Sequence, residues 1–428
     1  RTPDAAIANA LKADFTYNAL GQRAAQMLRD SGNTVRHTES YAYDVRNRLT
    51  SKTTPFGALT YIYDAQGNLA SLATNHGTNV TYAYDQLNRL AQAAALDPSD
   101  GFAKPTNYGY DAAGNLAVVA LPNTVTSLYA YDGLNRLQNL TSSRVSTLLA
   151  NHTYTLDLAG HRTGLAELSG RQTAWSYDAL YRLTNESVTA GAGDVAPAGS
   201  VGYALDKVGN RQSRASSLAG IGAVSGYVYD SNDRLTSTDA NNSTYDANGN
   251  TKTAVRSISG VPVVVTDAYD DQDRLIQRTD TAGNAIDILY DADGNRVAKT
   301  VNGTTTYYLV DVQNPTGYAQ VFEELAPAGA GSFTANRTFA YGMGLISQAT
   351  SQGATWQTRY FGYDGHGSVR FLTDASGTVT DAYAYDAFGN LVNRTGTTAN
   401  NYLYCGEQFD GDLAMYYLRA RYMNPDSG

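Results

Sequence analysis

The stretch "TYAYDQLNRL", Thr81 to Leu90, is one copy of a motif that recurs along most of the chain. Nearly the same letters begin at Ser40 ("SYAYDVRNRL") and at Leu128 ("LYAYDGLNRL"), and variants that end in Gly-Asn, such as "YIYDAQGNL" from Tyr61, stand between them. Self-similarity at a fixed period is the signature of a repeat architecture, in which each unit stacks on its neighbours. The sequence therefore predicts a repeat array.

The spacing of the copies indicates short strands and turns. Each copy contains an aspartate after a tyrosine or another apolar residue, and the first steps between these aspartates are 20 and 21 residues long. A period near 20 suits two strands with two turns, and no apolar pattern of helical period accompanies it. The motif aspartates are Asp44, Asp64, Asp85, Asp111, Asp132, Asp157, Asp178, Asp206, Asp230, Asp246, Asp270 and Asp291.

Within a copy, the residues predict a strand followed by a tight corner. Tyr82 and Tyr84 alternate with Ala83, as expected for a strand with one buried face. The aspartate that follows can accept hydrogen bonds from nearby backbone amides and so close a turn. In the Gly-Asn copies the glycine supplies a positive φ, and in the Arg-Leu copies the arginine four residues past the aspartate can form an ion pair across the turn.

Composition narrows the class of protein. The 428 residues are 42% hydrophobic and 17% charged, which is typical of a folded chain, and the net charge of −9 argues against a broad surface for nucleic acid or anionic lipid. The 33 tyrosines and 40 glycines favour β structure with many turns. A single cysteine excludes an internal disulfide framework, and no apolar run is long enough to span a bilayer.

Metal and cofactor chemistry is not predicted. The stretch "DADGN", Asp291–Asn295, lacks the glycine and glutamate positions of an EF-hand loop, so turn formation is the favoured interpretation. Cys405 is interpreted as a small, partly buried thiol in a strand. Tyrosine faces can stack on sugars, so carbohydrate binding stays open. The five histidines are expected at the surface, far from one another; they are His37, His76, His152, His161 and His366.

From Arg359 onward the sequence departs from the simple repeat. It reads "RYFGYDGHGSVRFLTDASGTVTDAYAYDAFGNL" and, from Tyr402, "YLYCGEQFDGDLAMYYLRARYMNPDSG". The repeats resemble the YD repeats of the Rhs family, and the last part resembles the Rhs repeat-associated core domain. Together the two resemblances cover nearly the whole chain. They divide it into a repeat array, residues 1–340, and a core domain, residues 341–428, with the small-residue loop Leu325–Ser332 near the passage between them.

The resemblance implies an all-β fold and a containment function. Rhs proteins, the C components of bacterial Tc toxins and the teneurins share a spiralling antiparallel β-sheet, which forms a hollow shell closed by the core domain. In the bacterial toxins the shell holds a C-terminal toxin, which is often delivered by type VI secretion or by a toxin-injection complex. The expected location is therefore secreted or at the cell surface. Because the chain begins with Arg1 and stops at "NPDSG", a fragment of a longer protein is expected.

The same resemblance implies one reaction at most, an aspartyl-protease-like self-cleavage just beyond the core. Its acids surround a D-P-x-x-G motif, whose first position is Asn424 here, so Asp426 becomes the candidate acid. Arg419 and Arg421 match the arginines of the family's "LRARY" and are expected to hold nearby carboxylates. Ala414 and the methionine after it depart from the signature, and the family's scissile bond lies beyond the last residue.

The function expected from the sequence is a β-shell that encapsulates and escorts a C-terminal toxin. The partners would be that cargo and a secretion or toxin-delivery machinery. The alternative is a non-toxin extracellular protein, adhesive or carbohydrate-binding, in which the stack serves as a spacer or ligand platform.

Overall fold

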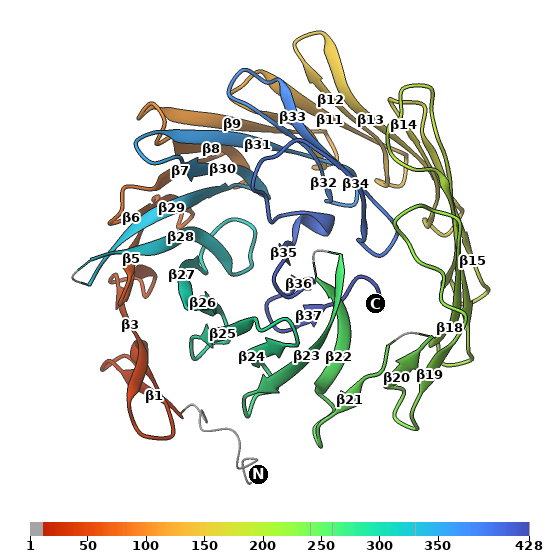
Figure 1. The fold of residues 1–428 in the computed structure, drawn as a ribbon. Coiled ribbons are helices and arrows are strands. Elements are labelled where there is room, and N and C mark those ends of the chain that lie inside the picture. Colours follow the sequence, from red (N-terminus) through yellow and green to blue (C-terminus); the bar gives the residue numbers. More distant parts are fainter. Residues whose placement is uncertain (1–11, 240, 259, 330, 428) are drawn as a thin grey trace. The chain divides into compact units, whose positions relative to one another are not determined.

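The computed structural model describes residues 12–239, 241–258, 260–329 and 331–427. In that part of the chain the regular structure is β-strand apart from one short 3-10 helix, η1 (Tyr404–Gly406). Figure 1 shows the strands following one another along the sequence, joined by short corners. The all-β fold of antiparallel hairpins expected from the repeats is therefore confirmed. No helix in the described residues is long and apolar enough to cross a membrane.

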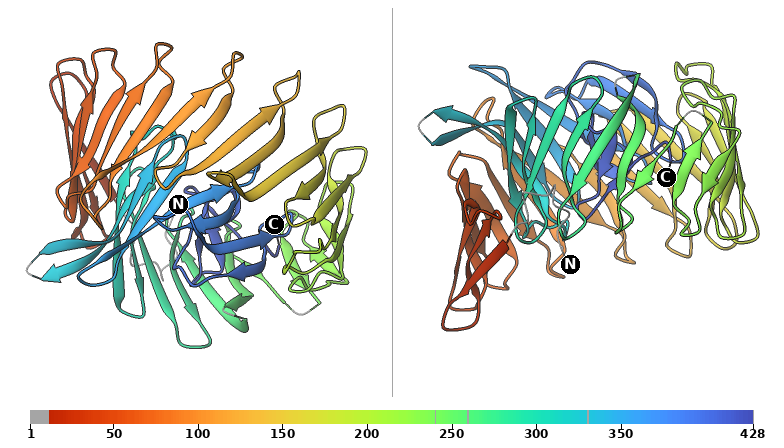
Figure 2. Two further views of the ribbon diagram at one scale, coloured as in Figure 1. Left: turned by 90° about the horizontal axis from the view of Figure 1, so that it is seen from above. Right: turned by 60° about the horizontal axis from the view of Figure 1, so that its bottom comes forward.

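The first and largest sheet has 18 strands, and strands adjacent in sequence pair antiparallel in it. Its neighbouring strands lie side by side in both views of Figure 2. Its strands are β1 (Lys12–Tyr17), β2 (Arg23–Arg29), β3 (Val35–Tyr43), β4 (Leu49–Thr54), β5 (Gly57–Tyr63), β6 (Leu69–Thr74), β7 (Asn79–Tyr84), β8 (Leu90–Leu96), β9 (Ala103–Tyr110), β10 (Leu116–Ala120), β11 (Val125–Tyr131), β12 (Leu137–Arg144), β13 (Thr147–Leu156), β14 (Arg162–Glu167), β15 (Gln172–Tyr177), β16 (Leu183–Thr189), β17 (Gly199–Leu205) and β18 (Arg211–Ser216).

A second long sheet has 14 strands, and two small sheets complete the structure. The small ones are β19 (Tyr227–Tyr229) with β20 (Leu235–Thr238), and β35 (Gln408–Asp410), β36 (Met415–Tyr417) and β37 (Tyr422–Met423). The 14 strands are β21 (Thr244–Tyr245), β22 (Thr251–Ile258), β23 (Val261–Tyr269), β24 (Leu275–Asp280), β25 (Ala285–Tyr290), β26 (Arg296–Val301), β27 (Thr304–Asp311), β28 (Gln320–Gly329), β29 (Ser332–Tyr341), β30 (Leu345–Ser351), β31 (Trp356–Tyr363), β32 (Val369–Thr373), β33 (Val379–Tyr385) and β34 (Leu391–Thr395).

The corners form as the motif predicts. Asp85 Oδ1 accepts hydrogen bonds from the backbone amides of Leu87 and Arg89, at 2.8 and 3.0 Å. Its other oxygen pairs with the Arg89 guanidinium at 2.7 Å. The same ion pair joins the arginine and the aspartate in all six Arg-Leu copies. The stretch "YNALGQR", Tyr17–Arg23, is a degenerate copy of the motif and folds likewise, with Asn18 in place of the aspartate.

The third residue after each corner aspartate has a left-handed backbone. In the Gly-Asn copies it is the expected glycine, for example Gly67 at φ 103°. In three of the six Arg-Leu copies it is asparagine, for example Asn88 at φ 59°, a residue that tolerates this region better than most, and in the other three it is aspartate or tyrosine. Both motif types therefore build the same corner, although the sequence predicts the positive φ only for the glycine copies.

A β-bulge follows each corner and changes which residues face inward. Tyr84 pairs with Leu90 but Ala83 pairs with Gln92, so Ala91 is an extra residue in the ladder. Because a bulge shifts the alternation by one, Leu90 and Ala93 are both buried although they lie three residues apart. The buried face after a corner therefore does not follow the simple period of two.

Contacts between successive corners explain why two motif types alternate. Arg182 of one Arg-Leu copy donates to the Asp206 carbonyl in the next corner at 2.8 Å, and equivalent contacts join three other pairs of neighbouring corners. In the opposite step, Asn115 of a Gly-Asn copy donates to Asn135 Oδ1 at 2.9 Å. Each motif type thus supplies a side-chain hydrogen-bond donor, and an oxygen of the following corner accepts the bond.

The second tyrosine of the motif joins corners in another way. The Tyr84 hydroxyl donates to the Leu69 carbonyl at 3.0 Å, directly after the preceding corner. The same hydrogen bond, between 2.6 and 3.0 Å, recurs in copies from both long sheets. It gives the tyrosine a role beyond packing, because a half-buried hydroxyl needs a partner.

The chain divides into two compact units, each built from segments far apart in sequence. The first comprises Arg1–Thr106, Val263–Arg359 and Tyr417–Tyr422, and the second comprises Asn107–Pro262, Tyr360–Tyr416 and Met423–Gly428. Each unit buries its own core between strands of the two long sheets. The most buried apolar residues include Leu59, Leu72, Leu309, Phe322 and Leu325 in the first unit, and Leu140, Val201, Val369, Leu372 and Leu413 in the second.

The prediction of a loop at Leu325–Ser332 is wrong. Its described residues belong to the hairpin of β28 and β29, where Pro327 pairs with Phe333. Small residues are compatible with this hairpin because Gly329 and Gly331 adopt positive φ at its tip. The division of the chain near residue 340 stays a prediction.

Candidate functional site

Asn424 and Asp426, two of the residues expected at the cleavage site, belong to the second unit. The Asp426 amide donates to Asn424 Oδ1 at 3.1 Å, so the structure brings these two predicted residues together. The Asp426 carboxylate pairs with Arg214 of β18 at 2.7 Å, although its side chain is 61% exposed. The Asp426 side chain is therefore positioned by the charge of Arg214. The Asn424 side chain holds the backbone amide of Asp426.

The backbone of the same segment is held as well. The Asp426 carbonyl accepts hydrogen bonds from Arg211 at 3.2 Å and from Arg214 at 3.0 Å. The Pro425 carbonyl accepts one from Asn390 at 3.1 Å. Two consecutive carbonyls thus have side-chain donors from distant parts of the sequence.

Arg419 and Arg421 lie in a short turn of the first unit, between β36 and β37. Arg419 has φ 60°, its Nε donates to the Ala319 carbonyl at 3.0 Å, and its guanidinium lies 5.4 Å from the centre of the Tyr318 ring. The Arg421 side chain is exposed, and its carbonyl accepts a hydrogen bond from Leu418 at 2.8 Å. Their expected contact with carboxylates stays a prediction.

Sequence reasoning missed Arg211, Arg214 and Asn390. Arg211 and Arg214 lie three residues apart, which suggests opposite faces of a strand. The bulge after the corner makes Gln212 the extra residue, so both arginines face the same side and both are buried. The available signal was their place after a corner, the position that also buries Leu90 and Ala93 in another repeat.

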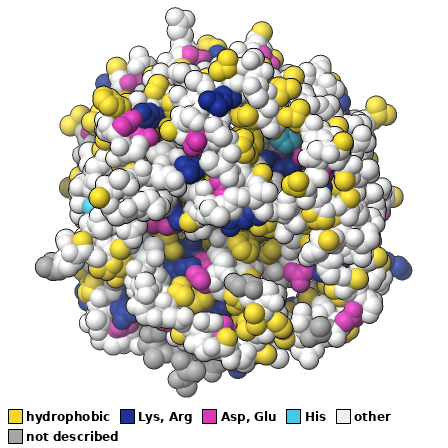
Figure 3. All heavy atoms as spheres, turned by 45° about the horizontal axis from the view of Figure 1, so that its top comes forward, with side chains coloured by type: hydrophobic (Ala, Val, Ile, Leu, Met, Phe, Trp, Pro, Cys, Tyr) yellow, Lys and Arg dark blue, Asp and Glu magenta, His cyan; other side chains and the backbone are white. Residues whose placement is uncertain are grey.

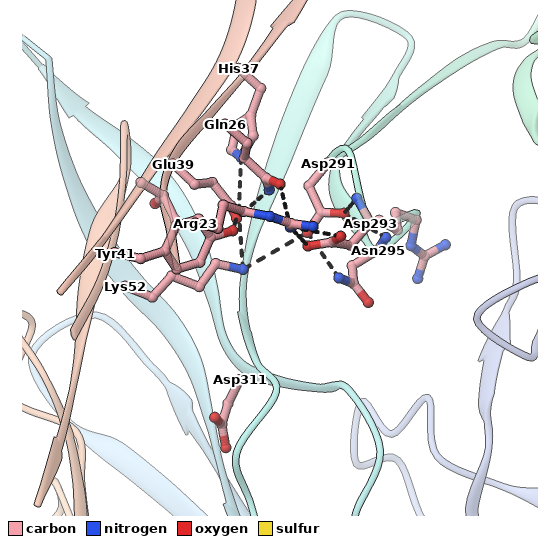
Figure 4. A network of polar contacts seen from close by, with 12 residues as sticks. Arg23, Gln26, His37, Glu39, Tyr41, Lys52, Asp291, Asp293, Asn295 and Asp311 are labelled. Carbon is pink, nitrogen blue, oxygen red and sulfur yellow. Dashed lines mark hydrogen bonds and ion pairs between the residues drawn. The ribbon is translucent and has the colours of Figure 1, made fainter. Parts of the chain in front are cut away.

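A buried polar network ties distant strands together in the first unit (Figure 4). Lys52 of β4, 2% exposed, lies 3.0 Å from Glu39 of β3 and 3.8 Å from Asp291 at the corner after β25. His37 and Gln26 also hydrogen-bond to Glu39. These side chains form ion pairs and hydrogen bonds with one another, and the Lys52–Asp291 pair connects the two long sheets. The network is therefore interpreted as structural.

The two carboxylates around Lys52 respond to burial differently. Burial by itself raises the pKa of Glu39, but the His37 hydrogen bond and the charge of Lys52 outweigh it and hold this pKa at about 2. Burial raises the pKa of Asp291, and the nearby Glu39 charge raises it further. Glu39 is therefore the ionised partner of Lys52 over the widest pH range.

The second unit contains a cavity of about 630 Å³ lined by several aromatic and acidic side chains. Glu186 of β16 lies in its wall, accepting hydrogen bonds from Trp175 Nε1 at 3.2 Å and from the Ala387 amide at 2.9 Å. Burial raises the pKa of Glu186 to about 7, and the charge of Asp386 contributes to the increase. A carboxyl that titrates near neutral pH in a cavity is a candidate acid or base.

The neighbouring Asp386 accepts the same hydrogen bonds as the aspartates of the other corners. One oxygen accepts the amides of Phe388 and Asn390, and the other accepts the Asn390 side chain at 2.8 Å. Burial also raises its pKa. Because the other corner aspartates make the same bonds, this geometry favours a structural role for Asp386.

Two expectations about single residues are wrong. His37 and His152 are buried, each 2% exposed, because they lie on inward faces of β3 and β13. Burial lowers the pKa of His152 to about 4, so it is neutral at pH 7. Cys405 is exposed and lies in η1 with φ 54°, since the chain turns there and does not continue as a strand.

The stretch "DADGN" forms a corner, as interpreted from the sequence. The Asp291 oxygens accept hydrogen bonds from the Asp293 and Asn295 amides and from the Asn295 side chain. Within the described residues, no group of three or more His, Cys, Asp or Glu side chains is placed to hold a metal ion. On the face drawn in Figure 3, basic and acidic side chains are interspersed.

Comparison with known proteins finds similarity to the first third of the chain. Residues 7–144 match the Teneurin YD-shell family model. The chain is 33% identical over 143 residues to the tRNA3(Ser)-specific nuclease WapA of Bacillus spizizenii, and 32% identical over 142 residues to the tRNA nuclease WapA of Bacillus subtilis strain 168. Each alignment covers 32% of this chain and 6% of the relative, so the chain corresponds to a small part of those proteins.

Solved structures match the whole fold. The crystal structure of TcdB2-TccC3-Cdc42 has a TM-score of 0.66 at 14% identity, covering 100% of this chain and 24% of that one. A structure of the Photorhabdus luminescens Tc holotoxin pore with a TccC3 mutation has a TM-score of 0.64 at 13% identity, covering 98% and 25%. The first third of the chain therefore matches the Teneurin YD-shell family, and the whole chain has the fold seen in these TccC3 structures.

Proposed function

We propose that this chain is part of a shell that encloses and escorts a C-terminal toxic effector. In this proposal residues 1–340 are the repeat array and residues 341–428 are the Rhs repeat-associated core domain. The observation that carries the proposal is the match of the entire chain to a quarter of a TccC3-containing structure. The names of the WapA relatives, which are nucleases, support a toxic cargo for chains with such repeats.

The physical task of such a shell is steric. A sheet that closes on itself leaves few free edges and isolates the enclosed chain from proteases and from the producing cell. Buried polar connections such as the Lys52 network support this task, since they fix distant strands of one unit against each other. The proposed place of action is outside the producing cell, after export by a secretion or toxin-delivery machinery such as type VI secretion.

A self-cleavage of the aspartyl-protease type would free the cargo inside the shell. Asp426 is the proposed acid of the present segment, and Arg419 and Arg421 are proposed to hold nearby carboxylates in place. Asn424 cannot donate or accept the proton because an amide does not titrate, so its proposed role is to shape the backbone through its bond to the Asp426 amide.

Intact mass spectrometry of the full-length gene product tests this function. We expect two fragments that stay together in native buffer and separate only in denaturant, because the cargo would be cut yet retained. A single chain that carries no further domain beyond the core would contradict the proposal. It would favour an extracellular adhesive or carbohydrate-binding role, which glycan-array binding would then examine.

A further inference from the structure

Three side chains from two distant parts of the second unit bind the Pro425–Asp426 segment. Arg214 contacts both the carboxylate and the carbonyl of Asp426, at 2.7 and 3.0 Å. Arg211 donates to the same carbonyl at 3.2 Å, and Asn390 donates to the Pro425 carbonyl at 3.1 Å. Charge-assisted hydrogen bonds of this kind fix direction as well as distance.

The two arginines are also held by contacts outside the segment. The Arg211 guanidinium lies 4.0 Å from the centre of the Phe388 ring and 5.1 Å from that of Tyr203. Arg214 donates from Nε to the Gly222 carbonyl at 2.8 Å. These contacts restrict both side chains independently of the segment, so little side-chain freedom is lost when they bind it.

Arg211, Arg214 and Asn390 together are called the anchor of the segment. Asn390 connects this anchor to a repeat corner. Its amide nitrogen donates to Asp386 Oδ2 at 2.8 Å as well as to the Pro425 carbonyl. The anchor thus combines a strand of the repeat array with a corner of the segment that resembles the core domain. Neither part alone supplies all the donors.

We propose that Arg211, Arg214 and Asn390 are positioning residues that hold the Asn424–Ser427 segment in register for self-cleavage. This inference rests on the proposed cleavage. Holding two consecutive carbonyls fixes the path of the chain, so the peptide bonds that follow enter the reaction site in one orientation. Orientation of this kind is a large part of the rate of an intramolecular reaction.

The test compares Arg214→Gln with Arg171→Gln in the full-length gene product. Arg171 is a matched control because it is also buried in the second unit, pairs with Asp194 at 2.7 Å and donates to the Ala196 carbonyl at 3.2 Å. The rate of cleavage is followed by denaturing mass spectrometry. Order in residues 423–428 is followed by hydrogen–deuterium exchange.

We expect Arg214→Gln to slow cleavage by about 100-fold, the loss that a misplacement of about 1 Å can produce. Exchange in residues 423–428 should rise at the same time, and Arg214→Lys should restore part of both. Arg171→Gln should leave the exchange of this segment unchanged. Wild-type cleavage and exchange in Arg214→Gln, or an equal loss in Arg171→Gln, would overturn the inference.

Asp426→Asn separates positioning from proton transfer. It removes the ion pair but leaves the two arginine bonds to the carbonyl. If cleavage stops while the segment stays protected from exchange, Asp426 is the acid and the arginines position it. A wild-type chain that is never cut would refute both the proposed cleavage and the positioning role, and exchange would still show whether the anchor exists.

Discussion

At the scale of single residues, the inward face carries charged side chains that a repeat sheet does not need for packing. Four buried charged residues share one position, the fourth residue of the strand that follows a corner. They are Lys52, Glu186, Arg214 and Arg278. Each has an oppositely charged or hydrogen-bonding partner, because an isolated buried charge is costly. The partners of Lys52 and Arg278 lie on the adjacent strand, whereas those of Glu186 and Arg214 come from segments about 200 residues further along the chain.

Lys52→Met should destabilise the protein by about 3–5 kcal/mol, because it leaves the ionised Glu39 buried without its cation. The double variant Lys52→Met/Glu39→Gln should recover most of this loss, since both charges are then absent. Chemical denaturation monitored by tyrosine fluorescence gives the free energies of unfolding. Lys207→Met at an exposed corner is the control, and an equal loss there would contradict the argument.

Glu186 should make stability decrease as the pH rises. Its folded pKa of about 7 lies above the ordinary value of 4.5 for a glutamate, so ionisation opposes folding. The favourable contribution is complete below pH 4.5 and is lost as the pH rises toward 7, by at most about 3 kcal/mol. Unfolding midpoints between pH 4 and pH 8 measure this slope.

Glu186→Gln should flatten that slope, although its absolute stability should fall because one of the two donors to Glu186 loses an acceptor. An unchanged slope in this variant would show that another group causes the pH dependence.

At the scale of elements, the corner is the repeating structural unit, and its contacts alternate. One exception shows how specific the alternation is. His161 replaces the asparagine of a Gly-Asn copy, and Tyr181 replaces the asparagine of the following corner. Their rings stack, with centres 4.2 Å apart and planes 20° apart, where other corners have an amide hydrogen bond. Two coupled substitutions thus keep neighbouring corners joined.

A double-mutant cycle on this pair should give a favourable coupling of about 0.5–1.5 kcal/mol for the stacked rings. His161→Asn and Tyr181→Asn should each destabilise, because each leaves one ring without its partner. The double variant should regain stability, since it restores the Asn115–Asn135 type of hydrogen bond. Differential scanning calorimetry measures the melting temperatures, and strictly additive losses would refute the coupling.

At the scale of the whole molecule, each compact unit depends on contacts between residues more than 200 positions apart. Tyr61 donates to Asp311 at 3.0 Å in the first unit, and Asn123 donates to Thr373 at 2.8 Å in the second. Contacts of such separation close large loops, which slows folding. Local hairpins need no such closure.

Refolding should therefore occur in at least two phases. Strand signal in far-ultraviolet circular dichroism should return before protection from hydrogen exchange at β5 and β27, which hold Tyr61 and Asp311. Manual-mixing refolding from urea with pulsed exchange measures both. Simultaneous recovery of the two signals would contradict this order.

The sequence by itself determined the repeating element. The alternation of tyrosine and alanine, the corner aspartate, the glycine and the arginine each act within about ten residues, so their geometry can be derived without tertiary context. The corner ion pairs and glycine conformations were predicted correctly on this basis. The family resemblance then supplied the expectation of a shell and its core.

Only the tertiary structure decided which side chains meet across the sheets. The bulge after each corner turns Arg211 and Arg214 to one face, against the simple alternation of a strand. Lys52 is buried at the same position of another repeat, and its partners Glu39 and Asp291 are named by no local pattern. Register and long-range pairing depend on the packing of both sheets together, and for that physical reason the anchor of Asp426 could not be read from the repeat.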